Sequence, residues 1–81
     1  MSIRVLFFAS LADIAGMRET SMNVSGFTDV LSVFNKFAGD FPALESYRSS
    51  VLCALNSEFA RPDSAVRDGD EVAFFPPVSG G

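Results

Sequence analysis

The sequence contains no histidine, no tryptophan and only one cysteine. Histidine is the commonest general base and metal ligand in proteins, so its absence removes the usual Ser/His and Cys/His catalytic pairs. A single cysteine cannot form an internal disulfide, and side-chain packing alone must therefore stabilise the fold. The sequence also lacks a glycine-rich loop of the kind that binds phosphate groups. We therefore expect neither a side-chain active site nor a metal site in this chain.

The remaining reactive side chains are better explained by structure than by chemistry. Cys53 has apolar neighbours in a stretch typical of a strand, which favours a small buried hydrophobe over a reactive thiol. A reactive thiol needs exposed, electropositive surroundings. The cluster of Asp68, Asp70 and Glu71 lacks the ligand spacing of a calcium loop and fits a turn better.

Positive charge and long apolar runs are scarce as well. Six basic residues stand against ten acidic ones, giving a net charge of -4, and the basic residues are scattered. This opposes nucleic-acid binding, which depends on clustered Lys and Arg. We find no leader-like segment and no run approaching the roughly 20 apolar residues of a membrane span. We expect a soluble, cytoplasmic protein that binds neither nucleic acid nor membrane, with an acidic surface suited to a basic groove on a protein partner.

Apolar residues make up 48% of the chain, and their spacing predicts an α+β domain over residues 1–75. The predicted elements are strands at 2–8, 19–24, 51–55, 58–60 and 71–75, short helical turns at 11–15 and 42–47, and one main helix between residues 28 and 39. Both terminal strands have continuous apolar runs, which suit central and parallel neighbours in a sheet. A mixed sheet of about five strands covered by one main helix is a β-grasp, or ubiquitin-like, fold.

The main helix has signals at both ends. Thr28 is a favourable N-cap and Asp29 follows it in the first turn. Lys36 is expected in the last turn, and Gly39 is the expected C-cap. The apolar stripe of this helix is predicted to comprise Val30, Leu31, Phe34, Phe37 and Ala38.

The last six residues form a tail of unusual composition: Pro76, Pro77, Val78, Ser79, Gly80 and Gly81. The prolines favour an extended backbone, so the tail can reach roughly 20 Å into a partner's cleft. The glycines lack Cβ atoms and can pass through a channel too narrow for other residues. Adenylation of the terminal carboxylate by an ATP-using partner would give a mixed anhydride, which a sulfur nucleophile can convert to a thiocarboxylate. The alternative is a disordered polar end without function.

An apolar patch is expected beside this tail. A single helix covers only one face of the sheet, so Phe8, Phe59 and Phe75 are predicted to lie on the other face. Exposed apolar patches of this kind mark partner-binding sites. The alternative is that the loops at 40–50 or 60–68 cover the patch.

Two stretches resemble a known family. They are Val5-Leu-Phe-Phe-Ala9 and Asp68-Gly-Asp-Glu-Val-Ala-Phe-Phe-Pro-Pro-Val-Ser-Gly-Gly81. They look like the small subunits of molybdopterin synthase, the MoaD-type sulfur carriers of the ubiquitin-like superfamily. The resemblance implies that Gly81 is adenylated by a ubiquitin-activating-like adenylyltransferase and then receives sulfur from a donor system. ATP would be used by that partner, and no cofactor is expected on this chain.

The resemblance also implies an assembly and a reaction. The tail, with Gly80, Ser79 and the two prolines, would enter the large subunit of a heterotetramer of two large and two small subunits. Sulfur would pass to cyclic pyranopterin monophosphate to form the molybdopterin dithiolene, so the chain would be the small subunit of a sulfurtransferase. Catalytic side chains would belong to the large subunit.

Three other functions stay open at this point. The chain can be a sulfur carrier of another pathway, such as thiamine synthesis, tRNA thiolation or a tungsten cofactor. It can be a ubiquitin-like modifier joined to target lysines through an isopeptide bond. It can also be a structural interaction module, for which deletion of Gly81 should have no effect.

Overall fold

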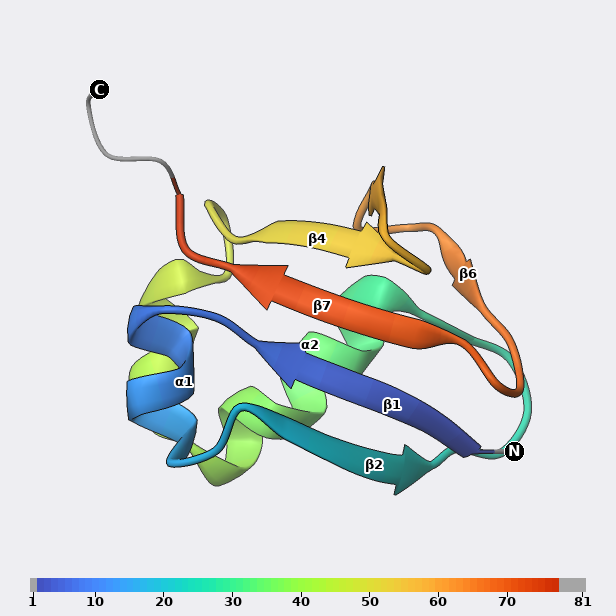
Figure 1. The fold of residues 1–81 in the computed structure, drawn as a ribbon, viewed down its shortest axis with the longest axis horizontal. Coiled ribbons are helices and arrows are strands. Elements are labelled where there is room, and N and C mark those ends of the chain that lie inside the picture. The colour runs from blue at the N-terminus through green and yellow to red at the C-terminus, as the bar shows by residue number, and fades with distance from the viewer. Residues whose placement is uncertain (1, 78–81) are drawn as a thin grey trace.

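The computed structural model describes residues 2–77 of the chain. Its elements are β1 (Ser2–Phe7), α1 (Ser10–Ala15), β2 (Glu19–Asn23), β3 (Thr28–Asp29), α2 (Val30–Asp40), the 3-10 helix η1 (Pro42–Tyr47), β4 (Leu52–Leu55), β5 (Glu58–Ala60), β6 (Ala65–Val66) and β7 (Glu71–Phe75). Five strands form one sheet in the order β2-β1-β7-β4-β5 (Figure 1). Strands β1 and β7 are parallel, and the other neighbours are antiparallel. The predicted β-grasp fold, with the two terminal strands central and parallel, is confirmed.

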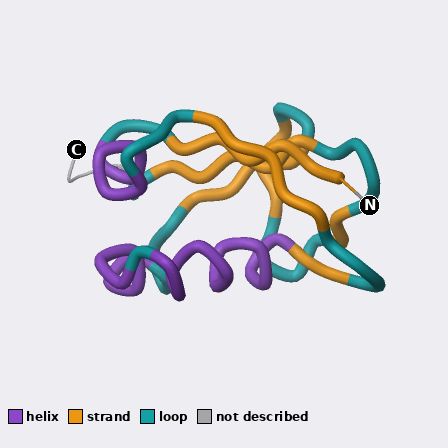
Figure 2. The backbone as a smooth tube through the Cα atoms, turned by 90° about the horizontal axis from the view of Figure 1, so that it is seen from below, coloured by secondary structure: helices purple, strands orange, loops and turns teal. Residues whose placement is uncertain are grey.

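The molecule has two layers, with the sheet in one and α2 and η1 in the other (Figure 2). Side chains alternate along β1, so that Ile3, Val5 and Phe7 are buried while their neighbours face the other way. Phe7 meets Phe37 of α2 edge to face, with ring centroids 5.1 Å apart. Phe74 of β7 meets Phe34 in the same manner at 5.2 Å. Phenylalanines from both layers therefore form the centre of the core.

The start of α2 differs from the prediction by one residue. Asp29, and not Thr28, is the N-cap, because the Asp29 carboxylate accepts a hydrogen bond from the Ser32 backbone N–H at 2.8 Å. The same hydrogen bond holds the pKa of the Asp29 carboxyl below its ordinary value, since it stabilises the ionised form. Thr28 belongs instead to β3, where it pairs with Val66 of β6.

The end of α2 and its buried face also differ from the prediction. The helix continues through Gly39 to Asp40 and is capped by Phe41, so Gly39 is not the C-cap and Lys36 is not in the last turn. Val33 is fully buried, whereas Leu31 is only partly buried. The other four residues of the predicted stripe are buried as expected.

The small sheet of β3 and β6 has no counterpart in the sequence-based prediction. It joins segments about forty residues apart, and two further backbone hydrogen bonds extend it. The Val30 N–H donates to the Ser64 carbonyl at 3.1 Å, and the Leu31 N–H donates to the Pro62 carbonyl at 2.9 Å. These bonds satisfy N–H groups at the start of α2 that have no partner within the helix. Among residues 2–77, no helix is long and apolar enough to span a membrane.

Candidate functional site

The face of the sheet opposite α2 carries a group of aromatic side chains. Leu52 of β4 lies directly opposite Phe75 of β7, and Ala54 lies opposite both Ala73 and Phe59. Residues that are directly opposite in a sheet point to the same face. We call the group of the exposed Phe8, Leu52 and Phe59 and the partly exposed Phe75 the aromatic patch.

Phe75 is at the centre of the aromatic patch. Its ring stacks on Phe8, with centroids 4.5 Å apart and an interplanar angle of 11°. The ring of Phe59 lies 6.4 Å away on the β5 side. Phe59 is 82% exposed and Phe8 is 42% exposed, so the loops leave these rings accessible. The structure thus brings together the three phenylalanines that the sequence analysis singled out.

Leu52 is the member of the patch that the sequence analysis missed. It lies at the start of β4 and is 37% exposed. Neighbouring side chains of a strand point to opposite faces, so Leu52 can be expected on the face opposite the buried Cys53. The antiparallel register with β7, however, is needed to place Leu52 opposite Phe75.

The tail begins at the edge of the aromatic patch. Strand β7 ends at Phe75, and the next residue, Pro76, is partly exposed while Pro77 is exposed. The Phe8 N–H donates to the Phe74 carbonyl at 3.1 Å, which holds the end of β1 beside the end of β7. The patch and the first residues of the tail are therefore contiguous. Ser79, Gly80 and Gly81, which the sequence analysis proposed as functional, lie outside the described residues.

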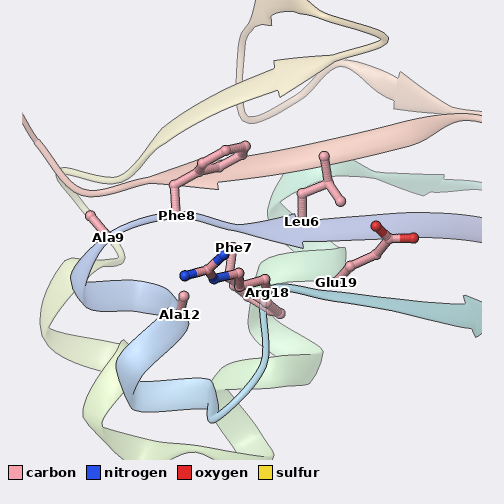
Figure 3. A pocket seen from close by; sticks show the side chains of 7 residues that line it. All are labelled: Leu6, Phe7, Phe8, Ala9, Ala12, Arg18 and Glu19. Atoms are coloured by element: carbon pink, nitrogen blue, oxygen red, sulfur yellow. The ribbon is translucent and has the colours of Figure 1, made fainter.

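A pocket of about 340 Å³ opens beside Phe8, between β1 and α1. It is lined by Leu6, Phe7, Phe8, Ala9, Ala12, Arg18 and Glu19 (Figure 3). Ala9 has φ 52° and ψ -130°, in a turn closed by a 3.1 Å hydrogen bond from the Leu11 N–H to the Phe8 carbonyl. A positive φ at this position favours glycine, so the alanine is strained. The sequence alone does not predict this pocket, because its residues come from three elements, β1, α1 and β2, and from the two loops that join them.

Three charged side chains, those of Arg4, Glu19 and Glu71, lie close together on the sheet. The Arg4 guanidinium lies 2.6 Å from the Glu19 carboxylate and 3.5 Å from that of Glu71. These groups are largely exposed, and such ion pairs contribute little to stability. They do, however, compensate the charge of Glu19 beside the pocket.

The other candidate groups have structural roles. Cys53 is buried, and its burial raises the pKa of the thiol, so that the group stays protonated at neutral pH. The Asp68 carboxylate accepts a hydrogen bond from the Ser2 backbone N–H at 2.7 Å, and that of Asp70 accepts one from the Arg67 N–H at 2.7 Å. The Asp70 contact is the local one expected of a turn residue, whereas the Asp68 contact ties this turn to the start of β1. Within residues 2–77, no three His, Cys, Asp or Glu side chains are grouped to hold a metal ion.

Comparison with known proteins gives consistent results. The family model described as the ThiS family matches residues 5–81. The molybdopterin synthase sulfur carrier subunit of Chlamydomonas reinhardtii is 37% identical, and the match covers 100% of both chains. Small archaeal modifier protein 1 of Haloferax volcanii is 38% identical, with 91% of this chain and 94% of the relative covered.

The solved structures agree with the sequence matches. The crystal structure of SAMP1 from Haloferax volcanii superposes with a TM-score of 0.82 at 37% identity, and each chain is covered completely. A family model that covers nearly the whole chain, together with full-length relatives above 30% identity, establishes the relationship. The chain belongs to the ThiS family.

Proposed function

We propose that this chain is the sulfur carrier subunit of a molybdopterin synthase and that it works in the cytoplasm. The observation that carries the proposal is the aromatic patch next to the start of the tail. A partner that covers the patch receives the tail in a fixed direction, because β7 and the prolines lead from one to the other. The full-length match to a molybdopterin synthase sulfur carrier subunit supports the same function.

In this proposal the reactive group is the carboxylate of Gly81. A ubiquitin-activating-like adenylyltransferase uses ATP to form the acyl adenylate and releases pyrophosphate. A sulfide nucleophile then forms a carbon–sulfur bond at the carbonyl carbon, the bond to the AMP oxygen breaks, AMP leaves, and a thiocarboxylate remains. The tail, through Gly80, Ser79, Pro77 and Pro76, carries this group into the large subunit, where sulfur passes to cyclic pyranopterin monophosphate.

The described side chains support a scheme in which this chain binds and presents the tail while the large subunit supplies the catalytic groups. The domain has a buried, protonated thiol and carboxylates that are engaged in turns, so it offers binding surface and not catalytic groups. We therefore assign catalytic side chains to the large subunit. Each small subunit needs one cleft for its tail, which calls for equal numbers of large and small subunits, and we propose two of each as the resemblance implies.

Intact-mass measurement tests the proposal. The protein is incubated with ATP, the adenylyltransferase from the same genome and a sulfur donor, and we expect a mass increase of one oxygen-to-sulfur replacement that maps to Gly81. A variant that lacks Gly81 and a variant with one residue added after it should fold normally and remain unmodified. Sulfur transfer by either variant would contradict the tail mechanism.

The archaeal relative favours a second function. Small archaeal modifier protein 1 is by its name a protein modifier, and it is as similar to this chain as the sulfur carriers are. In that case the activated Gly81 forms an isopeptide bond with lysines of target proteins. Conjugates of higher mass in cell extracts, lost when Gly81 is deleted and present without the large subunit, would favour this function over the first.

A further inference from the structure

The pocket is continuous with the aromatic patch through one residue. Phe8 stacks on Phe75 in the patch and also lines the pocket. A partner that covers Phe8 and Phe75 therefore also lies over the pocket. At about 340 Å³ the pocket is at the lower end of the range for ligand sites, roughly 300–1,000 Å³, and has room for partner side chains.

The lining of the pocket is apolar on one side and cationic on the other. Leu6, Phe8 and Ala12 supply apolar walls, and Figure 3 shows the Arg18 guanidinium turned toward α1. Glu19 is the acidic group nearby, but its carboxylate accepts hydrogen bonds from Arg4 at 2.6 and 3.2 Å. Arg18 forms no ion pair with any residue between 2 and 77. Within the described residues, Arg18 is therefore the basic group of the pocket lining that has no direct acidic partner, while Glu19 is held by Arg4.

The position of Arg18 is set by the backbone. Its carbonyl accepts a hydrogen bond from the Phe7 N–H at 2.8 Å, which holds this residue beside the end of β1. The side chain itself is exposed and makes no hydrogen bond within the described part of the chain. The guanidinium is therefore available to a partner, and substitutions of the side chain leave the backbone contact in place.

We propose that the pocket binds an acidic residue of the protein partner that covers the aromatic patch, with Arg18 pairing with the carboxylate. The apolar walls would hold the stem of that residue or an apolar neighbour. Arginine is suited to this role because its planar guanidinium binds a carboxylate through two parallel hydrogen bonds. This inference rests on the proposed function, which supplies the partner, and it adds a polar determinant of partner choice to an otherwise apolar surface.

The test measures binding of the full chain to the large subunit from the same genome by calorimetry, at low and high salt. We expect Arg18→Glu to weaken binding at least tenfold at low salt and to reduce the salt dependence. Lys36→Glu is the matched control, since it makes the same charge change on the exposed surface of α2, in the opposite layer. It should change the affinity less than twofold. A compensating change of the partner's carboxylate to lysine should restore binding of Arg18→Glu.

The outcomes separate this inference from the proposed function. Equal losses of affinity in Arg18→Glu and Lys36→Glu would show a long-range charge effect and would overturn the proposed role of the pocket. Unchanged binding of Arg18→Glu, together with weaker binding of Phe75→Ala, would overturn the proposed role of the pocket but would not affect the proposed function. Failure of the wild-type chain to bind the large subunit would overturn both.

Discussion

Phe74 and Phe75 are adjacent in β7, but their side chains lie on opposite faces of the sheet. Substitution by alanine should therefore affect different properties at the two positions. Phe74 is fully buried and contacts Phe34 and Phe7, with ring centroids 5.2 and 6.0 Å away. Phe75 is partly exposed and stacks on Phe8 on the open face. Phe74→Ala should therefore affect folding, and Phe75→Ala should affect binding.

The expected losses of stability follow from these contacts. Removing a buried phenylalanine side chain costs about 3–5 kcal/mol, because transfer and cavity terms add. A domain of this size has a free energy of unfolding of roughly 4–12 kcal/mol, so Phe74→Ala should unfold a large fraction of the protein or leave it marginally stable. Phe75→Ala loses an aromatic stack worth about 0.5–1.5 kcal/mol and the burial of a ring that is only partly covered, so it should cost less than Phe74→Ala. Urea unfolding followed by circular dichroism measures both, and this probe suits a chain without tryptophan.

Binding, compared per folded molecule, should show the reverse order. A central aromatic residue of an interface contributes about 2 kcal/mol or more, which corresponds to roughly thirtyfold weaker binding of Phe75→Ala to the large subunit. Phe59→Ala, on the rim of the patch, should have a smaller effect. Equal losses of stability in Phe74→Ala and Phe75→Ala, or wild-type affinity of Phe75→Ala, would refute the assignment of the two faces.

Two further predictions concern the ends of helices. The hydrogen bond from Ser32 lowers the pKa of Asp29 below its ordinary value of 3.8, so its stabilisation is complete above that pH and is lost as the pH falls through the lowered folded-state pKa. The free energy of unfolding, measured from pH 2 to 7, should fall more steeply toward low pH in the wild type than in Asp29→Asn. Asparagine keeps the cap but does not titrate in this range. Parallel curves for the two proteins would contradict the capping role. Ala9→Gly should raise the free energy of unfolding by about 1 kcal/mol, because glycine accepts the φ of 52° without strain. Ala9→Val is the matched control and should lower it, and a loss of stability in Ala9→Gly would contradict strain at this turn.

The elements that the sequence predicts well are those with a local signal. Strand β1 alternates buried and exposed residues, and the apolar face of α2 repeats with the helical period, so both were predicted within one or two residues. The three phenylalanines of the aromatic patch followed from the same reasoning. Phe8 and Phe75 both lie on the face that the single main helix does not cover, and the parallel pairing of β1 with β7 brings them together.

Some of the features that the sequence does not predict depend on contacts between distant segments, and others on how a helix ends or packs. Thr28 is an acceptable N-cap locally, but its pairing with Val66 extends the backbone and moves the cap to Asp29. Gly39 is a typical C-cap locally, yet Phe41 takes that place, and its N–H donates to the Phe37 carbonyl at 2.8 Å. The pocket with Arg18 depends on how α1 folds against the end of β1. The cap at Asp29 is thus decided by a tertiary contact that overrides local preference, whereas the end of α2 is shifted by a hydrogen bond within the helix itself.

The surface of the domain must carry the specificity of this protein. A terminal glycine carboxylate has the same chemistry in a sulfur carrier and in a modifier, and the relatives include proteins with both names. The activated end therefore cannot determine which partner it meets. The aromatic patch supplies apolar area to any partner, whereas Arg18, in the role that we propose for it, would reject partners that lack the matching carboxylate. Differences in pathway among such chains should accordingly be found at the pocket and the rim of the patch, and exchanging these residues between relatives should exchange their partners while leaving the chemistry of the tail unchanged.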